Sequence, residues 1–154
     1  MLKSKKKIII YLVGAVLGLI VDRFFKFLAV NSFFNKEFGG ISLVDNFFKL
    51  NFIPNKNIAF SIPFSGVILN IIIICIIIII IYWLIYLVNK KEYLEFILLV
   101  FVVLGAVSNL VDRLKFGFVI DYLDLSYFTV FNIADIMIVG GVGGLIYFSR
   151  LTAK

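Results

Sequence analysis

Two aspartates, Asp121 and Asp135, stand 14 residues apart in a strongly apolar part of the chain. A carboxylate in or beside a membrane is costly, so its presence there indicates a function. If the two groups approach each other, like-charge repulsion and desolvation make them share one proton near neutral pH. The ionised member can then deprotonate a water while the protonated member donates to a carbonyl oxygen, as peptide hydrolysis requires. We predict this chemistry, which depends on the two groups lying close together.

The residue types that the chain lacks narrow the chemistry further. Histidine is absent, which excludes Ser-His and Cys-His nucleophilic pairs and imidazole metal sites. The single cysteine, Cys75, lies inside an isoleucine run and is expected to be an inert thiol in lipid or at a helix contact. A hydrolase with a metal held by carboxylates stays an alternative, but no acid cluster has ligand spacing. We therefore expect neither a metal nor a cofactor.

The composition is that of an integral membrane protein. Of the 154 residues, 63% are hydrophobic and 16% are charged, and the mean hydropathy is +1.14, far outside the usual range of a soluble domain. The formal net charge is +6, but the basic residues gather next to apolar runs and form no basic stripe interleaved with aromatic residues. We expect membrane lipids around the protein and no nucleic acid as partner.

Four apolar stretches are long enough, or nearly so, to cross a hydrocarbon core that needs about 20 residues of helix. They cover residues 8–30, 67–88, 96–114 and 130–149. These stretches predict an all-α membrane protein with four transmembrane helices in a single membrane-embedded domain over residues 1–154. The chemistry expected of the two aspartates would make it a peptidase domain. Outer loops are then expected at residues 31–66 and 115–129.

The first outer loop is too long to be a simple connector. Residues 49–52 alternate polar and apolar side chains, and their aromatic neighbours suit a short strand or hairpin on the membrane surface. Pro54 and Pro63 are expected to limit regular structure between them. The predicted fold therefore includes a small extracytoplasmic β-containing region between the first and second helices.

Basic residues predict the orientation in the membrane. They cluster before the first span, between the second and third, and after the fourth, and by the positive-inside rule these segments are cytoplasmic. The bias is imperfect, because the outer loops also carry lysines. Both termini are expected inside. The cytoplasmic basic residues are Lys3, Lys5, Lys6, Lys7, Lys90, Lys91, Arg150 and Lys154.

The depth of the acids follows from this orientation. With a helical rise of about 1.5 Å per residue, Asp22 lies roughly 21 Å and Asp112 roughly 24 Å from the inner ends of their spans. Asp135 lies roughly 8 Å below the outer start of the fourth span. The hydrocarbon core is roughly 30 Å thick, so the acids converge on the outer leaflet.

Pairing within or beside a helix is the alternative explanation for most of these charges. Asp22 can pair with Arg23 and Lys26 along one helix face, because residues three and four apart are neighbours. Asp112 can reach the interface by extending along the helix surface. Asp135 differs, because it has no basic residue within a helical turn, and a purely structural role fits it least.

Two motifs near the C-terminus are the most specific elements of the chain. Gly117-x-Val119-x-Asp121-Tyr122 and Phe131-Asn132-x-Ala134-Asp135 follow an Asn109-x-x-Asp112-Arg113 element in that order. Together with upstream residues they make the chain resemble the lipoprotein signal peptidases (signal peptidase II) over nearly its whole length. The upstream matches are Asp22, Lys26, Asn55, Ala59, Phe60, Ser61, Gly105 and Ala106.

The resemblance implies a four-helix membrane aspartyl protease of bacteria that needs no cofactor. Its substrates are prolipoproteins with a diacylglyceryl-modified cysteine, which are cut on the N-terminal side of that cysteine. The resemblance also implies that Asp121 and Asp135 are the catalytic pair. We expect a monomer in the bacterial inner membrane, with both termini cytoplasmic and its active site near the outer leaflet. Residues expected to line, brace or support the substrate site are Asn55, Asn109, Arg113, Asn132, Asp22, Lys26, Asp112 and Ala134.

Three residues depart from the family pattern. Phe25 stands where Ser or Thr is usual, and Asn57 and Ser108 each replace a Gly. Asparagine tolerates left-handed backbone better than most residues, so Asn57 can keep the turn that Gly would make. None of the three departures touches the aspartate pair.

Two other classes of membrane protein are weighed against a peptidase. A proton-coupled transporter would carry polar groups through the whole membrane, whereas the second span has Asn70 as its only strongly polar residue. A structural membrane protein would only pair its acids with lysines. For a peptidase, the aromatic residues of the first outer loop are expected to cover the cleft and exclude water; they are Phe47, Phe48, Phe52 and Phe60.

Overall fold

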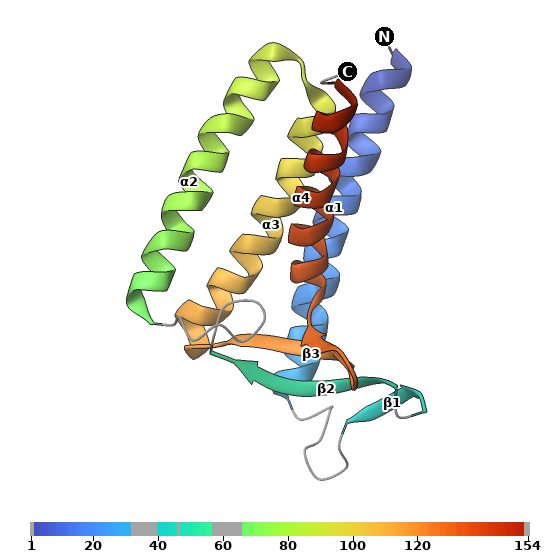
Figure 1. Ribbon diagram of the computed structural model, residues 1–154, viewed down its shortest axis with the longest axis vertical. Coiled ribbons are helices and arrows are strands. Elements are labelled where there is room, and N and C mark those ends of the chain that lie inside the picture. The colour runs from blue at the N-terminus through green and yellow to red at the C-terminus, as the bar shows by residue number, and fades with distance from the viewer. Residues whose placement is uncertain (1, 32–39, 46, 57–65, 153–154) are drawn as a thin grey trace.

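The chain folds into four long helices with a small sheet across one end (Figure 1). The structure is a computed structural model that describes residues 2–31, 40–45, 47–56 and 66–152. Both ends of the chain lie at the side opposite the sheet. The elements are α1 (Leu2–Val30), β1 (Ile41–Val44), β2 (Phe48–Asn55), α2 (Val67–Lys90), α3 (Tyr93–Phe116), β3 (Val119–Leu125), β4 (Thr129–Phe131) and α4 (Ile133–Thr152).

All four helices are long and apolar enough to cross a membrane. The candidate spans are Ile8–Val30, Val67–Lys90, Tyr93–Phe116 and Ile133–Leu151. The fourth begins three residues later than the sequence suggested, because strand β4 occupies residues 129–131 and Asn132 precedes the helix. The expected architecture of four membrane helices with a β-containing region is confirmed.

A tight reversal joins α2 to α3. Lys91 adopts a left-handed conformation with φ of 61°, and its N–H donates to the carbonyl of Val88 at 3.1 Å. The N–H of Glu92 donates to the carbonyl of Leu87 at the same distance. This pair of bonds is a Schellman motif, which satisfies the last carbonyls of a helix. It starts α3 at Tyr93, three residues before the expected position.

The sheet is antiparallel with the strand order β1-β2-β3-β4. Strand β2 confirms the expected strand in the first loop, whereas the second loop was expected without the two strands that it contains. Pro54 pairs with Ile120 of β3, beyond the part of β2 that faces β1. A proline is tolerated at such an edge, so β2 continues through Pro54 to Asn55.

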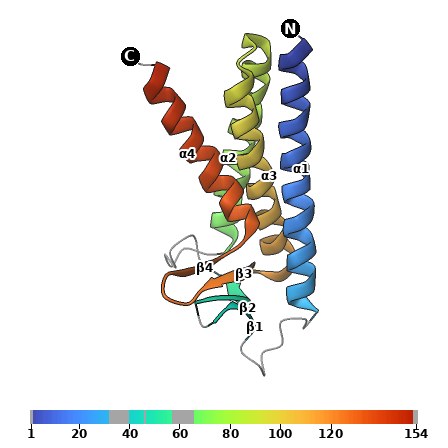
Figure 2. The same cartoon turned by 90° about the vertical axis from the view of Figure 1, so that its right-hand side faces the viewer.

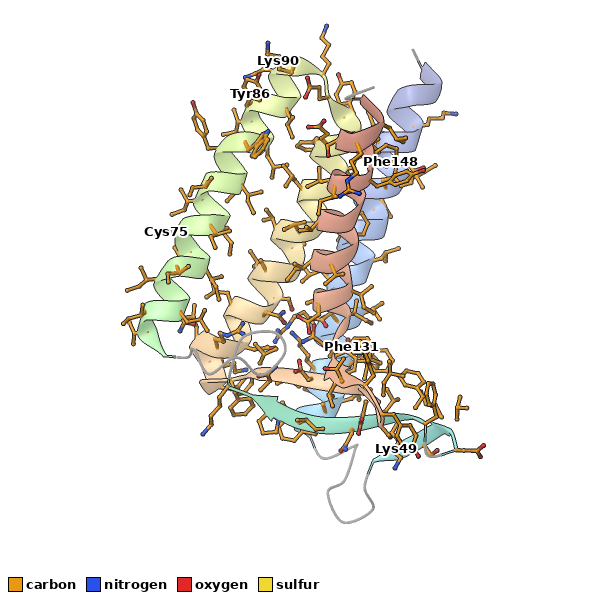
Figure 3. All side chains as sticks on the ribbon, in the orientation of Figure 1. Lys49, Cys75, Tyr86, Lys90, Phe131 and Phe148 are labelled. Atoms are coloured by element: carbon orange, nitrogen blue, oxygen red, sulfur yellow. The ribbon has the colours of Figure 1, made fainter. Side chains whose placement is uncertain are left out.

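The interior of the helix bundle holds a group of buried polar residues, whereas many large hydrophobic side chains are exposed on its outer surface. Helix α3 packs against each of the other three helices, and Figure 2 shows α4 diverging from α1 with distance from the sheet. Isoleucines and aromatic residues cover the outer surface of α2, where Cys75 is also exposed (Figure 3). The buried polar residues are Asp22, Lys26, Ser108, Asn109, Asp112, Asp121 and Asn132.

Glycine lets α4 approach α3 beside the buried polar residues. A Cβ atom at Gly105 would lie 2.5 Å from the carbonyl oxygen of Ala134 and 2.9 Å from Ile138. Any larger residue would therefore push the start of α4 away from α3. Gly105 thus fixes how closely the first turn of α4 lies against the helix that carries Asn109 and Asp112.

Candidate active site

Asp135 is held at the start of α4 by reciprocal hydrogen bonds with Asn132. The N–H of Asp135 donates to Asn132 Oδ1 at 2.9 Å, and the N–H of Asn132 donates to Asp135 Oδ2 at 3.2 Å. This is the geometry of a capping box, with Asn132 as the N-cap and Asp135 as the third helical residue. The half-buried carboxylate of Asp135 therefore has a fixed place at the helix N-terminus.

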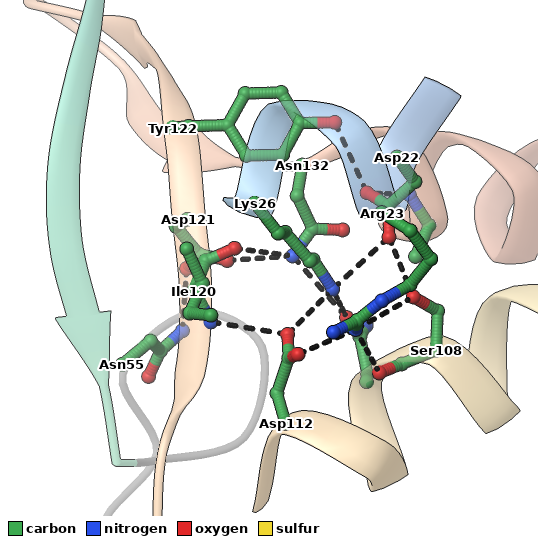
Figure 4. A network of polar contacts seen from close by, with 12 residues as sticks. Asp22, Arg23, Lys26, Asn55, Ser108, Asp112, Ile120, Asp121, Tyr122 and Asn132 are labelled. Carbon is green, nitrogen blue, oxygen red and sulfur yellow. Dashed lines mark hydrogen bonds and ion pairs between the residues drawn. The ribbon is translucent and has the colours of Figure 1, made fainter. Parts of the chain in front are cut away.

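Asp121 lies on β3 and is 2% exposed. Its Oδ1 accepts a hydrogen bond from Asn132 Nδ2 at 2.7 Å, and its Oδ2 accepts one from Asn55 Nδ2 at 3.0 Å (Figure 4). Asn132 therefore hydrogen-bonds to both aspartates. Although the chain separates them by 14 residues, the strand and the helix bring the two carboxylates to the same asparagine.

The pKa of Asp121 is raised to about 7, chiefly by burial and then by the charge of Asp135. Hydrogen bonds from Asn55 and Asn132 and the charge of Lys26 lower this pKa and are already included in that value. The influence of Asp135 shows that the two carboxyl groups interact electrostatically. A carboxyl group with this pKa exchanges its proton near neutral pH, as acid–base catalysis requires.

Asn109 donates a hydrogen bond to Asp135, and Lys26 sets the orientation of the Asn109 amide. Asn109 Nδ2 donates to Asp135 Oδ1 at 2.8 Å, while its Oδ1 accepts from Lys26 Nζ at 2.8 Å. Because an ammonium group can only donate, the oxygen of Asn109 must face Lys26. Its NH₂ group is therefore directed at Asp135.

A buried ion cluster lies beside Asp121 (Figure 4). Lys26 Nζ lies 2.7 Å from Asp112 Oδ2 and 3.2 Å from Asp22 Oδ2. Arg23 Nη1 lies 2.5 Å from Asp112 Oδ1. The expected pairing along one face of α1 is found for Asp22 and Lys26, but Arg23 reaches across to α3. The cluster contains two acids and two bases, which satisfies the requirement that buried charges be paired.

Arg113 and Ala134 occupy different places around the pair. Arg113 interacts electrostatically with Asp135, Asp121 and Asp112, so its positive charge acts on the site from α3. Ala134 is fully buried, and its N–H donates to Asp22 Oδ1 at 3.1 Å. The side chains expected to support the site therefore contact or electrostatically influence the pair, or belong to the adjoining ion cluster.

Two hydroxyl groups that were not among the expected site residues also belong to the network. Ser108 Oγ donates to Asp22 Oδ2 at 2.6 Å, and the hydroxyl of Tyr122 donates to Asp22 Oδ1 at 3.0 Å. In the sequence Ser108 was visible only as a departure from the family pattern, and Tyr122 only as the neighbour of Asp121. The signal that could have found them is their position directly beside Asn109 and Asp121.

The aromatic residues expected to cover the substrate site do not form one cluster among the described residues. Phe52 packs against Phe118, with 6.3 Å between the ring centroids, in the small core around Ala29 and Ile120. Phe47 is exposed and contacts Tyr127. Phe60, like Asn57, Ala59 and Ser61, lies outside the described residues. The covering role stays a prediction.

The model of the family described as signal peptidase (SPase) II matches residues 14–151. The chain belongs to the signal peptidase II family. It is therefore an aspartic peptidase, and the expected enzyme class is confirmed. Among the described residues, no group of three or more Asp, Glu, Cys or His side chains is arranged to hold a metal ion.

Relatives across bacteria support this membership in signal peptidase II. The chain is 34% identical over 150 residues to the lipoprotein signal peptidase of Syntrophus aciditrophicus, with 90% of each chain covered. It is 37% identical over 131 residues to that of Clostridium acetobutylicum, with 80% of this chain and 82% of the relative covered. Proteins of this similarity share a fold and a general activity.

Solved structures of bacterial membrane enzymes share the architecture. One, determined by the in meso method, superposes with a TM-score of 0.77 at 25% sequence identity. The superposition covers 94% of this chain and 89% of the solved chain. A second gives a TM-score of 0.69 at 26% identity, with 89% and 90% covered. The chain is accordingly a multi-pass membrane protein of the signal peptidase II fold.

Proposed function

We propose that Asp121 and Asp135 are the catalytic pair of a prolipoprotein signal peptidase. The enzyme removes the signal peptide from diacylglyceryl-modified prolipoproteins by cutting on the N-terminal side of the modified cysteine. The observation that carries this proposal is the pair of hydrogen bonds from Asn132, which joins a carboxylate on β3 to one on α4. The family membership supports the reaction class.

The pair hydrolyses the peptide bond by moving protons between water and substrate. The ionised carboxylate takes a proton from a water, whose oxygen attacks the scissile carbonyl carbon, while the protonated carboxyl donates to the carbonyl oxygen. The tetrahedral intermediate then collapses, the C–N bond breaks, and the amino group of the modified cysteine leaves with a proton. The pair thus returns to its starting state with one shared proton.

Neutral donors hold the carboxylates for this reaction. Asn55 and Asn132 orient Asp121, and Asn109 orients Asp135. Preorganised donors fix the geometry before the substrate arrives, so little reorganisation is needed during the reaction. We assign to Arg113 the role of bracing substrate carbonyl groups, because its charge acts on both aspartates.

The orientation of the fold suits a lipid-modified substrate. Lys90 lies at the end of the helices opposite the sheet (Figure 3), on the side of both chain ends. The positive-inside rule makes that side cytoplasmic, so the aspartate pair belongs near the outer leaflet of the inner membrane. A diacylglyceryl group there keeps its acyl chains in hydrocarbon while the adjoining peptide bond reaches the pair. We propose that the enzyme acts as a monomer.

Substitution of each aspartate tests the proposal. Asp121→Asn and Asp135→Asn are purified in detergent and assayed with a diacylglyceryl-modified precursor, with a chelator present throughout. We expect each to lose at least about a thousandfold in kcat. Asp124→Asn is the matched control, because Asp124 is a half-buried acid on the same strand and accepts a hydrogen bond from Asn51 Nδ2 at 3.4 Å.

The outcomes separate the pair from other mechanisms. Cleavage at the wild-type rate in either Asp121→Asn or Asp135→Asn would refute the pair. Wild-type cleavage that occurs without the chelator and is lost in its presence would indicate a metal instead. Asp124→Asn is expected to keep the wild-type rate.

A further inference from the structure

Tyr122 is a buried residue that the proposed reaction leaves without a role. It follows Asp121 on β3, is 0% exposed, and is the largest fully buried side chain among the described residues. Its ring stacks on Phe25, with 5.5 Å between the centroids and 12° between the planes. This stacking fixes the direction of the hydroxyl group. A buried hydroxyl requires hydrogen-bond partners, and this one has two.

The two partners of the Tyr122 hydroxyl lie on different helices, and Figure 4 shows the one on α1, Asp22. The hydroxyl donates to Asp22 Oδ1 on α1 at 3.0 Å and accepts the N–H of Ile133 at 3.2 Å. Ile133 is the first residue of α4, and the first N–H groups of a helix have no acceptor within it. Tyr122 therefore caps the helix in which Asp135 is the third residue.

Asp22 completes this cap. Its Oδ1 also accepts the N–H of Ala134 at 3.1 Å, while its Oδ2 is held by Ser108 and Lys26. Tyr122 and Asp22 thus take the first two amides of α4, and the side chain of Asn132 takes the third. The first turn of the helix is fastened by side chains from β3, from α1 and from its own N-cap.

We propose that Tyr122 is a positioning residue that sets the separation between Asp121 and Asp135. It does so by tying the strand that carries one acid to the first turn of the helix that carries the other. This inference deepens the proposed function and rests on it. Tyr122 is next to Asp121 in the chain, and Ile133 is two residues before Asp135, so the bond between them connects the two backbone segments directly.

The state of the phenol suits this role. Burial, followed by the charge of Asp22, raises the pKa of Tyr122 above its usual range. The hydroxyl therefore stays protonated and keeps donating to Asp22 at every pH at which the enzyme works. Without the hydroxyl, Ile133 loses its acceptor and α4 is free to shift against β3. The electrostatic interaction between the two carboxyl groups then weakens, because it falls with distance.

Removal of this single oxygen atom tests the inference. Tyr122→Phe keeps the ring that stacks on Phe25, and Tyr127→Phe is the matched control, since Tyr127 lies in the β3–β4 turn and is 82% exposed. We expect Tyr122→Phe to lower kcat about tenfold, as small misplacements of reacting groups do, with KM unchanged. Tyr127→Phe is expected to retain both constants.

A titration that does not depend on activity accompanies the kinetics. The carboxyl groups of isotope-labelled protein are titrated by infrared spectroscopy, with Asp121→Asn used to assign the Asp121 band. The charged groups that act on Asp121 are Asp135 from α4 and Lys26 from α1, together with Arg113 from α3. Because only the contribution of Asp135 weakens, the Asp121 midpoint is expected to move to lower pH in Tyr122→Phe and to stay in place in Tyr127→Phe.

The values of kcat, the Asp121 midpoint and the unfolding temperature together separate a positioning role from a structural one. An unchanged kcat and an unchanged titration in Tyr122→Phe, below its unfolding temperature, would overturn the inference even if the aspartate variants are inactive. A lower unfolding temperature with the wild-type kcat and midpoint would make Tyr122 merely structural, which also overturns it. A shifted midpoint together with active aspartate variants would instead contradict the catalytic pair. Phe25→Leu, which removes the stacked ring, is expected to move kcat and the midpoint in the same directions as Tyr122→Phe.

Discussion

Two pairs of carboxylates lie side by side at the sheet end of the helices, and different groups hold them. Asp22 and Asp112 are fully buried and form ion pairs with Lys26 and Arg23. Asp121 and Asp135 accept hydrogen bonds from asparagine amides. The first pair is neutralised in place by cations, while the second is oriented by neutral groups.

In the proposed function, one small protein keeps acids for two purposes. A cation within a few ångströms stabilises the charged form of a carboxylate, whereas burial and a second carboxylate oppose it. The effects that oppose ionisation prevail at Asp121, where burial and Asp135 raise the pKa to about 7. The ion-paired acids can then serve as structure, and the amide-held acids can exchange a proton.

The largest expected effect comes from removing the central cation. Lys26→Met leaves Asp22 without its ion pair and Asp112 with Arg23 alone, so we expect a loss of about 3–5 kcal/mol in the free energy of unfolding. Unfolding in mixed micelles by a denaturing detergent measures it. Lys56→Met, at an exposed lysine after β2, is the control. Equal stability of the two variants would mean that the cluster is not held by Lys26.

The second expected effect is a pH dependence of stability that arises from Asp121. The pKa of Asp121 is raised from 3.8 to about 7 in the folded protein, so the folded state binds more protons than the unfolded state between these values. Stability therefore falls as pH rises through that window. Asp121→Asn escapes this loss.

Thermal unfolding across pH measures this second effect. The melting temperature of Asp121→Asn minus that of the wild type is expected to increase from pH ~4 to pH ~8, the range that brackets both values of the pKa. Asp124→Asn controls for the loss of a negative charge on the same strand. A difference that is constant with pH would show that folding does not raise the pKa of Asp121.

The smallest effect is expected at the rim of the ion cluster. Arg23 has 34% of its side chain exposed, and Asp112 keeps Lys26 when Arg23 is replaced. Arg23→Gln is therefore expected to cost about 1 kcal/mol or less and to leave kcat unchanged, as measured by unfolding and by precursor cleavage. A loss as large as that in Lys26→Met would make Arg23 the main partner of Asp112.

The length of the apolar stretches sufficed to predict the four helices, because about 20 apolar residues in succession have few other structures available. The aspartate pair could also be predicted, since an acid such as Asp135 without a basic neighbour in an apolar helix needs a reason. Strand β2 was visible because its polar and apolar residues alternate.

Other features depend on contacts between distant segments. Strand β3 reads as an apolar stretch with two acids, and it becomes a strand by pairing with β2 and β4. The expected partner of Arg23 was Asp22 on the same helix, whereas tertiary packing pairs Arg23 with Asp112 of α3. The hydroxyl groups of Ser108 and Tyr122 have ordinary neighbours in sequence, and Asp22 gathers them only in the folded chain.

The capping box at the start of α4 bears on how a substrate complex should be trapped. Asp135 both reacts, in the proposed mechanism, and fastens the helix through the N–H of Asn132, so replacing it weakens a helix terminus together with the chemistry. Asp121 has no such duty in a helix. An inactive variant for capturing an uncleaved lipoprotein precursor is therefore better made at Asp121. Removing its charge leaves the cap of α4, which lies beside the bound peptide, as it is in the wild type.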